Sequence, residues 1–169
     1  MKQEHGNMWL TRRHCLALGA LALCPIGSAR AATPLHLVAG TLALRGFDAV
    51  SYFFEGGQGP VPGRSQFELG WNARAWRFAS AANREAFRRN PDIYAPRLRG
   101  FDPAGILEGR LVDADPLIYA VLPRVSGTGL YLFRNAANRA RIAEHASLVV
   151  EAESRWPALA SITDASLID

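Results

Sequence analysis

Sulfur is scarce in this chain of 169 residues, which has two cysteines, Cys15 and Cys24. Both lie within the first 31 residues, which we expect to be removed as an export signal. The mature protein would then contain no thiol. This excludes disulfide bonds, thiolate metal sites and cysteine nucleophiles, even in a compartment that permits disulfides.

Motifs of several enzyme classes are absent from the sequence. The chain contains no Gly-x-Ser-x-Gly elbow, phosphate loop, dinucleotide fingerprint or His-Glu-x-x-His zinc motif. One glycine-rich segment, residues 56–63, precedes a predicted strand rather than a helix, so it does not predict phosphate binding. The cofactor and the substrate, if any, are therefore unknown from the sequence.

The net charge of the chain is small when the first 31 residues are not counted. Four of the nineteen basic residues lie there, namely Lys2, Arg12, Arg13 and Arg30, with one of the fifteen acidic residues, Glu4. The rest of the chain holds fifteen arginines and fourteen acids, a net charge of +1 in place of +4. This balance gives no support to a nucleic-acid partner.

The N-terminal residues have the layout of a bacterial export signal. A mostly polar start is followed by the twin arginine Arg12-Arg13, a short apolar run over residues 15–26 and the small-x-small sequence of residues 29–31. The run is too short to span a membrane, and "TRRHCL" resembles the twin-arginine signal. We expect a signal peptide over residues 1–31, twin-arginine translocation, and a periplasmic mature chain without a membrane span.

Two short motifs occur twice, in the same order. "RGFD" stands at residues 45–48 and 99–102, fifty-four positions apart, and "AANR" at residues 81–84 and 136–139, fifty-five apart. We interpret the pair as an internal repeat with units of about 50 residues. Two copies are too few for a solenoid, so a closed pseudo-symmetric pair is expected.

The hydrophobic pattern predicts a helix, a β-hairpin and a helix in each unit. For the first unit we expect a short strand at 41–44, a short helix from Asp48, strands at 66–71 and 76–78, and helices at 80–89 and 91–94. For the second we expect a helix from Asp102, strands at 116–122 and 130–133, and one last helix from Asn135, ending before Pro157.

A two-stranded hairpin is marginal alone, so each half would supply apolar surface that the other lacks. The expected fold class is α+β, with units at residues 32–98 and 99–157 and a weakly patterned, mobile tail at 158–169.

The first unit resembles the YHS domain family. Five segments match the family pattern in order. Residues 46–53 ("GFDAVSYF") match Gly-Tyr-Asp-Pro-Val-Ala-Tyr-Phe, residues 76–78 ("WRF") match aromatic-x-Phe, and residues 80–87 ("SAANREAF") match Ser-x-x-Asn-Arg-x-x-Phe. Residues 90–91 ("NP") and 94–96 ("YAP") match the last two segments, Asn-Pro and Tyr-Ala-Pro. The second unit looks like a diverged copy that lacks the last two segments.

The resemblance implies soft-metal binding, because some family members accompany heavy-metal transporters and many carry a cysteine after Tyr-Ala-Pro. In this chain Asp102 stands where that cysteine would fall. A carboxylate is a hard oxygen ligand and suits copper(I) or mercury poorly. The implied soft-metal site is therefore not expected here.

The two aspartates of "RGFD", Asp48 and Asp102, are the first candidate site residues. As an equivalent pair they would do acid–base chemistry or hold a hard cation, whereas as helix N-caps each would contribute about 1 kcal/mol to stability. We favour capping, which accounts for both positions.

Further candidates lie in "AANR" and among the aromatic residues. Arg84 and Arg139 are either an anion clamp or, as we favour, partners in structural ion pairs, for which the capping aspartates are candidates; simple solvent exposure is the remaining alternative. Asn83 and Asn138 are expected to complete capping boxes. Four aromatic residues are further candidates, namely Tyr52, Tyr94, Trp71 and Trp76. They would either line a ligand cleft or, as their spacing favours, form part of the hydrophobic core.

A zinc site is disfavoured by the histidine count. It would need both histidines outside the signal, His36 and His145, with a carboxylate, and they lie far apart in sequence. We expect His145 to be a partly buried structural residue and assign no metal ligand.

The leading functional hypothesis is an exported, non-enzymatic binding or accessory protein. Its partner would be an unknown small ligand or protein, bound in a cleft between the halves or on an exposed apolar patch. The alternatives are binding of a metal ion or metal complex through carboxylates such as Asp48 and Asp102, and, more weakly, an enzyme or enzyme subunit that uses them.

Overall fold

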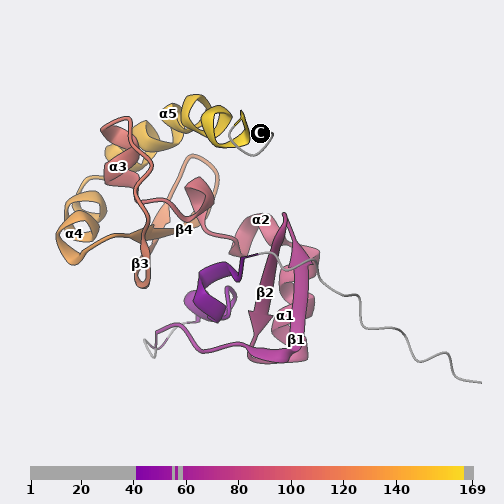
Figure 1. Cartoon of the computed structure of the whole chain (residues 1–169). Helices are drawn as coiled ribbons and strands as arrows, with labels where there is room; N and C mark the ends of the chain where they lie inside the picture. The colour runs from indigo at the N-terminus through magenta and orange to yellow at the C-terminus, as the bar shows by residue number, and fades with distance from the viewer. Residues whose placement is uncertain (1–40, 55, 57–58, 166–169) are drawn as a thin grey trace, which may run out of the picture. The chain divides into compact units, whose positions relative to one another are not determined.

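The computed structural model describes residues 41–54, 56 and 59–165, which form a mixed α and β fold (Figure 1). The expected class, α+β, is confirmed. The predicted signal peptide and His36 lie outside the described residues. In chain order the elements are η1 (Ala43–Gly46), η2 (Ser51–Phe53), β1 (Arg64–Trp71), β2 (Arg74–Phe78), α1 (Ala81–Arg89), α2 (Pro91–Tyr94), η3 (Arg97–Gly100), α3 (Pro103–Leu107), β3 (Asp115–Pro123), β4 (Thr128–Phe133), α4 (Ala136–Glu144) and α5 (Ala146–Ala165).

Both predicted hairpins are confirmed as antiparallel pairs, β1 with β2 and β3 with β4. The turn of the first hairpin holds Asn72 and Ala73 at φ 49° and 55°, the positive values of a tight hairpin turn. Each ladder also has one register shift at the same place. In the first hairpin, the shift follows the pair formed by Arg64 and Phe78. In the second hairpin, it follows the equivalent pair formed by Asp115 and Phe133.

The short strand predicted at 41–44 is wrong. Leu42 makes a single bridge to Ala75, and the chain then turns into η1, where Leu44 and Arg45 have φ of 52° and 50°. Residues with a Cβ rarely adopt positive φ, so hydrophobic patterning does not predict this turn. The same conformation occurs in η3, where Leu98 and Arg99 have φ of 54° and 52°.

The helix predicted at Asp48 is a turn followed by the single 3-10 turn η2, whereas the helix predicted at Asp102 is confirmed as α3. The difference lies in the first helical residues. Pro103 has its φ fixed near the helical value and follows an aspartate cap, which favours a regular helix.

The first core cluster combines residues from both halves of the chain. Trp76, Phe78 and Phe87 form an aromatic group between the first hairpin and α1, with ring centroids 4.8 Å and 5.2 Å from Phe87. Leu130 and Leu132 of β4 are buried in this same cluster. The second hairpin therefore supplies part of the wall of the first core.

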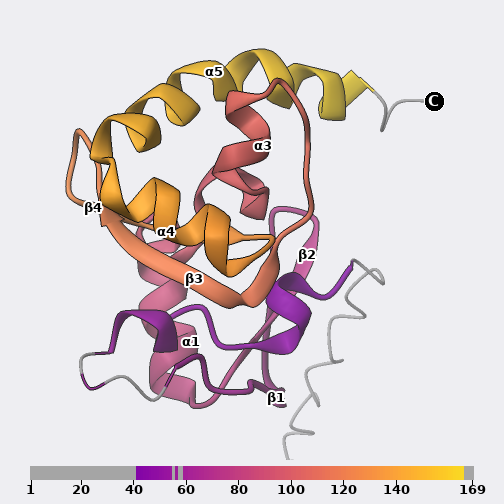
Figure 2. The ribbon, with the colours of Figure 1, turned by 90° about the vertical axis from the view of Figure 1, so that its left-hand side faces the viewer.

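The second core cluster lies on the opposite face of β4. Tyr131 and Phe133 alternate with the two leucines along the strand and pack with Ile142 of α4 and with Val149 of α5. Because successive side chains of a strand point to opposite faces, β4 is buried on both sides. Figure 2 shows α4 beside the second hairpin and α5 passing over α3.

The single last helix that we predicted is two helices. The chain breaks at His145, with φ −128° and ψ 85°, between α4 and α5. The break matches the one at Asn90 between α1 and α2. Helix α5 also continues through Pro157 to Ala165, so the prediction that the helix ends before Pro157 is wrong. Its apolar face persists there, since Trp156 and Leu159 pack on the second cluster.

Within the described ranges, no helix has both the length and the apolar composition that a membrane span requires.

Candidate functional site

Asp48 is fully buried and accepts three hydrogen bonds. Its Oδ1 accepts from the backbone N–H of Val50 at 2.9 Å. Its Oδ2 accepts from the backbone N–H of Ala79 at 2.8 Å and from the side-chain amide of Asn83 at 2.6 Å. The carboxylate thus ties the turn before η2 to the start of α1.

Asp102 is held in the same way in the second half. It is fully buried, and its Oδ1 accepts from the N–H of Ala104 at 2.9 Å, which caps α3. Its Oδ2 accepts from the N–H of Arg134 at 3.0 Å and from the side-chain amide of Asn138 at 2.6 Å. Every donor comes from the same half as its aspartate, and no hydrogen bond joins Asp48 to Asp102.

The burial and hydrogen bonding of the two aspartates limit the chemistry that they can perform. Both oxygens of each carboxylate accept hydrogen bonds from groups that hold the fold. Neither side chain is exposed to solvent. A general base needs a free oxygen within reach of a substrate proton, and a cation ligand needs a free lone pair directed at the ion. The arrangement suits a structural anchor.

Asn83 and Asn138 connect the helix caps to these aspartates. Ser80 caps α1 by accepting from the N–H of Asn83, and Asn135 caps α4 by accepting from the N–H of Asn138, so both predicted caps are confirmed. In a capping box the third helical side chain would return to the cap residue. Here it donates to the buried aspartate instead, because a carboxylate is the stronger acceptor.

The two arginines beside these asparagines do not take part in the network. Arg84 is half-buried and Arg139 is exposed. We expected them to pair with the capping aspartates, but the asparagines occupy that position. Among the described residues neither guanidinium has an ion pair with an acidic side chain.

Tyr52 joins the two halves rather than lining a cleft. Its hydroxyl donates to the carbonyl oxygen of Pro116 at 3.1 Å, and its ring meets Tyr119 edge-on at 4.8 Å. Burial raises the pKa of the Tyr52 hydroxyl above its ordinary value, and the nearby Tyr119 and Asp115 add to the effect. The hydroxyl is therefore neutral at physiological pH and acts as a hydrogen-bond donor.

The other aromatic candidates and the histidine also have structural surroundings. Trp71 and Trp76 pack against Phe87, and Tyr94 packs against Phe53. His145 is exposed, which corrects the expectation of partial burial, because it occupies the break between α4 and α5. In the part of the chain that the structure describes, no three His, Cys, Asp or Glu side chains are grouped to hold a metal ion.

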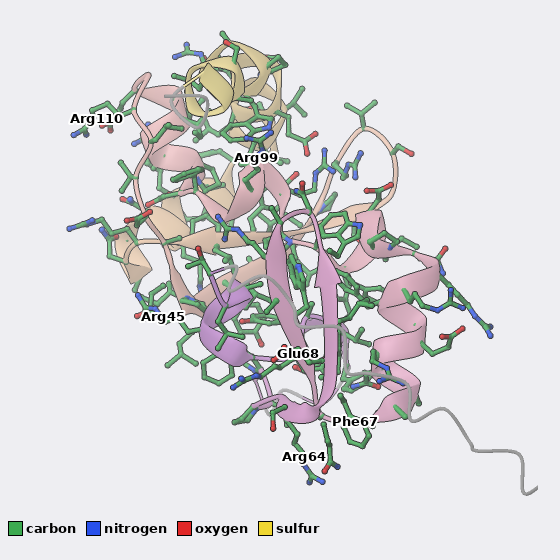
Figure 3. All side chains as sticks on the ribbon, turned by 45° about the vertical axis from the view of Figure 1, so that its right-hand side comes forward. Arg45, Arg64, Phe67, Glu68, Arg99 and Arg110 are labelled. Atoms are coloured by element: carbon green, nitrogen blue, oxygen red, sulfur yellow. The ribbon has the colours of Figure 1, made fainter. Side chains whose placement is uncertain are left out.

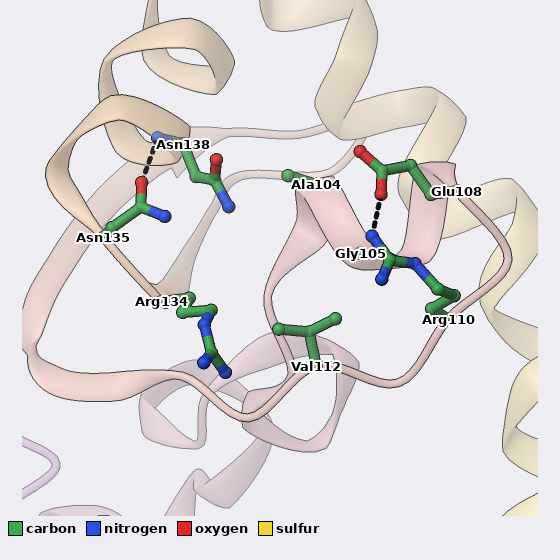
Figure 4. Close-up of a pocket in the computed structure, with 8 residues that line it drawn as sticks. All are labelled: Ala104, Gly105, Glu108, Arg110, Val112, Arg134, Asn135 and Asn138. Carbon is green, nitrogen blue, oxygen red and sulfur yellow. Dashed lines mark hydrogen bonds and ion pairs between the residues drawn. The ribbon is translucent and has the colours of Figure 1, made fainter.

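A polar hollow of about 500 Å³ lies beside the Asp102 network (Figure 4). It is formed by α3, the segment that follows α3 and the start of α4. Its lining includes two arginines from different elements, Arg110 and Arg134. The full set of lining residues is Ala104, Gly105, Glu108, Arg110, Val112, Arg134, Asn135 and Asn138.

This hollow was not among the predicted sites, although the sequence carries one signal for it. The motif "FASAANR" at 78–84 becomes "FRNAANR" at 133–139, so the second copy has Arg134 and Asn135 where the first has Ala79 and Ser80. When one copy has a charged side chain where the other has an uncharged one, the surfaces of the two copies differ at that position. The sequence predictions rest on the residues that the two copies share, and so they do not include Arg134.

A second polar cluster fastens α5 to the sheet. Oε1 of Glu153 accepts from the hydroxyl of Tyr131 at 2.7 Å and from Nε of Arg97 at 3.0 Å, and Arg124 lies 3.9 Å away. Burial raises the pKa of Glu153, but the hydrogen bonds from Tyr131 and Arg97 and the two positive charges outweigh it. The pKa is therefore lowered from its ordinary value of 4.5.

We expect this cluster to make stability pH-dependent. Because the folded pKa of Glu153 is lowered, its contribution is complete above about pH 5 and is lost as pH falls through 4.5 toward the folded value. Glu153→Gln should flatten the fall in free energy of unfolding between pH 5 and 3, measured by urea denaturation. An equally steep fall in the variant would contradict this assignment.

Exposed arginines are spread over several elements. Figure 3 shows the side chains of Arg45, Arg64 and Arg110 extending from the ribbon at separate places. The ion pair of Arg45 with Asp115 at 3.6 Å is largely exposed, so it contributes little to stability.

Comparison of the chain with family models, curated proteins and solved structures gave no significant match. The resemblance to YHS domains therefore stays a prediction.

Proposed function

We propose that the chain is an exported, periplasmic, non-enzymatic binding or accessory protein, built from two YHS-like units of which the second has diverged. The observation that carries this proposal is that Asp48 and Asp102 are fully buried and that each accepts three hydrogen bonds from its own half. The residues that would have served an enzyme or a metal site are occupied in holding the fold.

The matching details of the two halves support a duplication. Asp48 and Asp102 each accept from the backbone N–H two residues later, from a residue that follows a hairpin and from an asparagine of the next helix. The N–H of each aspartate donates to a valine carbonyl at 2.9 Å, that of Val61 or Val112. Matching bonds of this kind, at the two copies of "RGFD" and "AANR", are expected of a repeated unit.

The hollow beside α3 is the region we propose for the ligand. Small-molecule sites are concave, with volumes of roughly 300–1,000 Å³ and a few placed polar groups. The hollow meets the size criterion and is lined by polar side chains such as Arg134, which has no ion pair among the described residues. It lies within the second unit and not between the units, where we first expected a cleft.

Native mass spectrometry of the protein exported from its own host would test this function. Twin-arginine cargo is folded before export, so a ligand acquired in the cytoplasm would leave with the protein. We expect a mass above that of residues 32–169 alone, or a bound partner chain. Apoprotein alone, together with no partner on cross-linking in the periplasm, would contradict the proposal.

Calorimetry tests the metal alternative. Titration of the protein with copper, nickel, zinc and iron salts is expected to give flat traces, because both aspartates are fully buried and their oxygens already accept hydrogen bonds from the fold. Saturable heat that is lost in Asp48→Asn or Asp102→Asn, with the fold intact, would favour carboxylate metal binding over the proposed function.

A further inference from the structure

We propose that the hollow beside α3 binds a small anion with a carboxylate or phosphate group, between Arg110 and Arg134. This inference rests on the proposed function, since it names the ligand class of the same site. It depends on the placement of two arginines from different elements around one concave surface.

The two guanidinium groups approach the hollow from opposite sides. Arg134 follows β4 and Arg110 follows α3, and Figure 4 shows their side chains on either side of Val112. Arg110 is paired with Glu108, whereas Arg134 has no ion pair among the described residues. The charged residues of the lining are two arginines and one glutamate, which leaves one net positive charge facing the hollow.

Amide groups add donors and acceptors at the same surface. The side-chain oxygen of Asn135 is used to cap α4, and the amide of Asn138 is used by Asp102. The amide nitrogen of Asn135 and the side-chain oxygen of Asn138 make no hydrogen bond with a described residue. Arginine forks match the paired oxygens of carboxylate and phosphate groups, and neighbouring amides would bond to further polar atoms of such a ligand.

The first unit provides an internal comparison. Ala79 occupies the place of Arg134, because the backbone N–H of each donates to the aspartate of its own half. Ser80 likewise occupies the place of Asn135 as the cap of the helix. The fold therefore does not require an arginine at 134, since an alanine makes the same backbone hydrogen bond. This leaves the Arg134 side chain available for binding.

The chemistry also disfavours a neutral or cationic occupant. Binding a neutral molecule would remove water from the Arg134 guanidinium without compensating its charge, and a cation would be repelled by Arg134, which has no ion pair among the described residues. The partial exposure of the lining means that the ligand would be held by charged hydrogen bonds rather than by apolar burial.

Nuclear magnetic resonance titration of the full chain tests the site, with succinate and inorganic phosphate as probes and sodium chloride at matched ionic strength as the reference. We expect saturable shifts of the Arg134 Nε–H and of the Asn135 and Asn138 amides with at least one probe. Arg134→Ala should weaken binding by about tenfold or more, because it removes a charged hydrogen bond.

Arg139→Ala is the matched control, since it removes one positive charge from α4 at an exposed residue outside the lining. It should leave the affinity within about twofold, a change too small for a direct ligand contact. Equal weakening in both variants, or no saturable shift with either probe, would overturn the anion site. The broader function is tested separately, by native mass spectrometry and by metal calorimetry, so failure of the anion site alone leaves it standing.

Discussion

Asp48→Asn is expected to lower the free energy of unfolding by about 3–5 kcal/mol. The carboxylate oxygens accept from Val50, Ala79 and Asn83, and asparagine has one oxygen and one N–H₂ group in the same volume. In either orientation, the amide nitrogen faces at least one buried donor. That donor loses its acceptor where water does not replace it, and the charge-assisted bonds are lost as well.

Asp102→Asn should have nearly the same effect, since its three donors are of the same kinds. Urea denaturation of both variants measures the change. Asp92→Asn, at an exposed position in α2, serves as the control and should stay within about 0.5 kcal/mol of the original protein. A variant at 48 or 102 that keeps full stability would show that the carboxylate is not an anchor and would reopen a chemical role.

Leu130→Ala is expected to cost about 2–5 kcal/mol, the range for truncating a buried leucine. Leu130 belongs to the second hairpin, yet it is fully buried in the cluster that contains Trp76 and Phe87 of the first half. The cavity would open between the two halves, where neither can collapse without moving the other.

Thermal and urea unfolding would measure this loss, with Leu117→Ala as the control because 57% of Leu117 is exposed. Unfolding should remain a single transition in the variant, since β4 contributes residues to both core clusters. Two separate transitions, or a loss below about 1 kcal/mol, would mean that the halves are independent in stability.

The elements that the sequence predicts well are those governed by local rules. The two hairpins follow from alternating apolar residues and a short turn, and the caps Ser80 and Asn135 follow from their side-chain oxygens. The repeated motifs also indicated the residues that matter most to the fold, because Asp48 and Asp102 anchor the two networks.

The features that we missed are set by tertiary contacts. Leu44 and Leu98 adopt positive φ and have side chains buried in the first and second clusters respectively, and no local pattern predicts this. Helix α5 passes through Pro157 because packing of Leu159 outweighs the missing hydrogen bond. The break at His145 has no glycine or proline to mark it.

The candidate site was the least predictable part. The residues we selected, such as Asp48 and Tyr52, carry reactive groups but are enclosed by partners. Arg134 was not predicted because a single surface arginine matches no functional motif, and only its replacement of Ala79 in the repeated segment distinguishes it. Its placement opposite Arg110 depends on how the loop after α3 returns toward β4, which is a property of the folded chain.

Separate production of residues 32–96 and 97–169 tests the central claim, that the two halves complete one interior, more directly than any substitution. We predict that each segment alone gives neither dispersed amide resonances nor a cooperative thermal transition, and that mixing them restores both. The account would be contradicted if the first segment alone unfolded cooperatively with the stability of the whole chain, because Leu130 and Leu132 would then contribute nothing to its core.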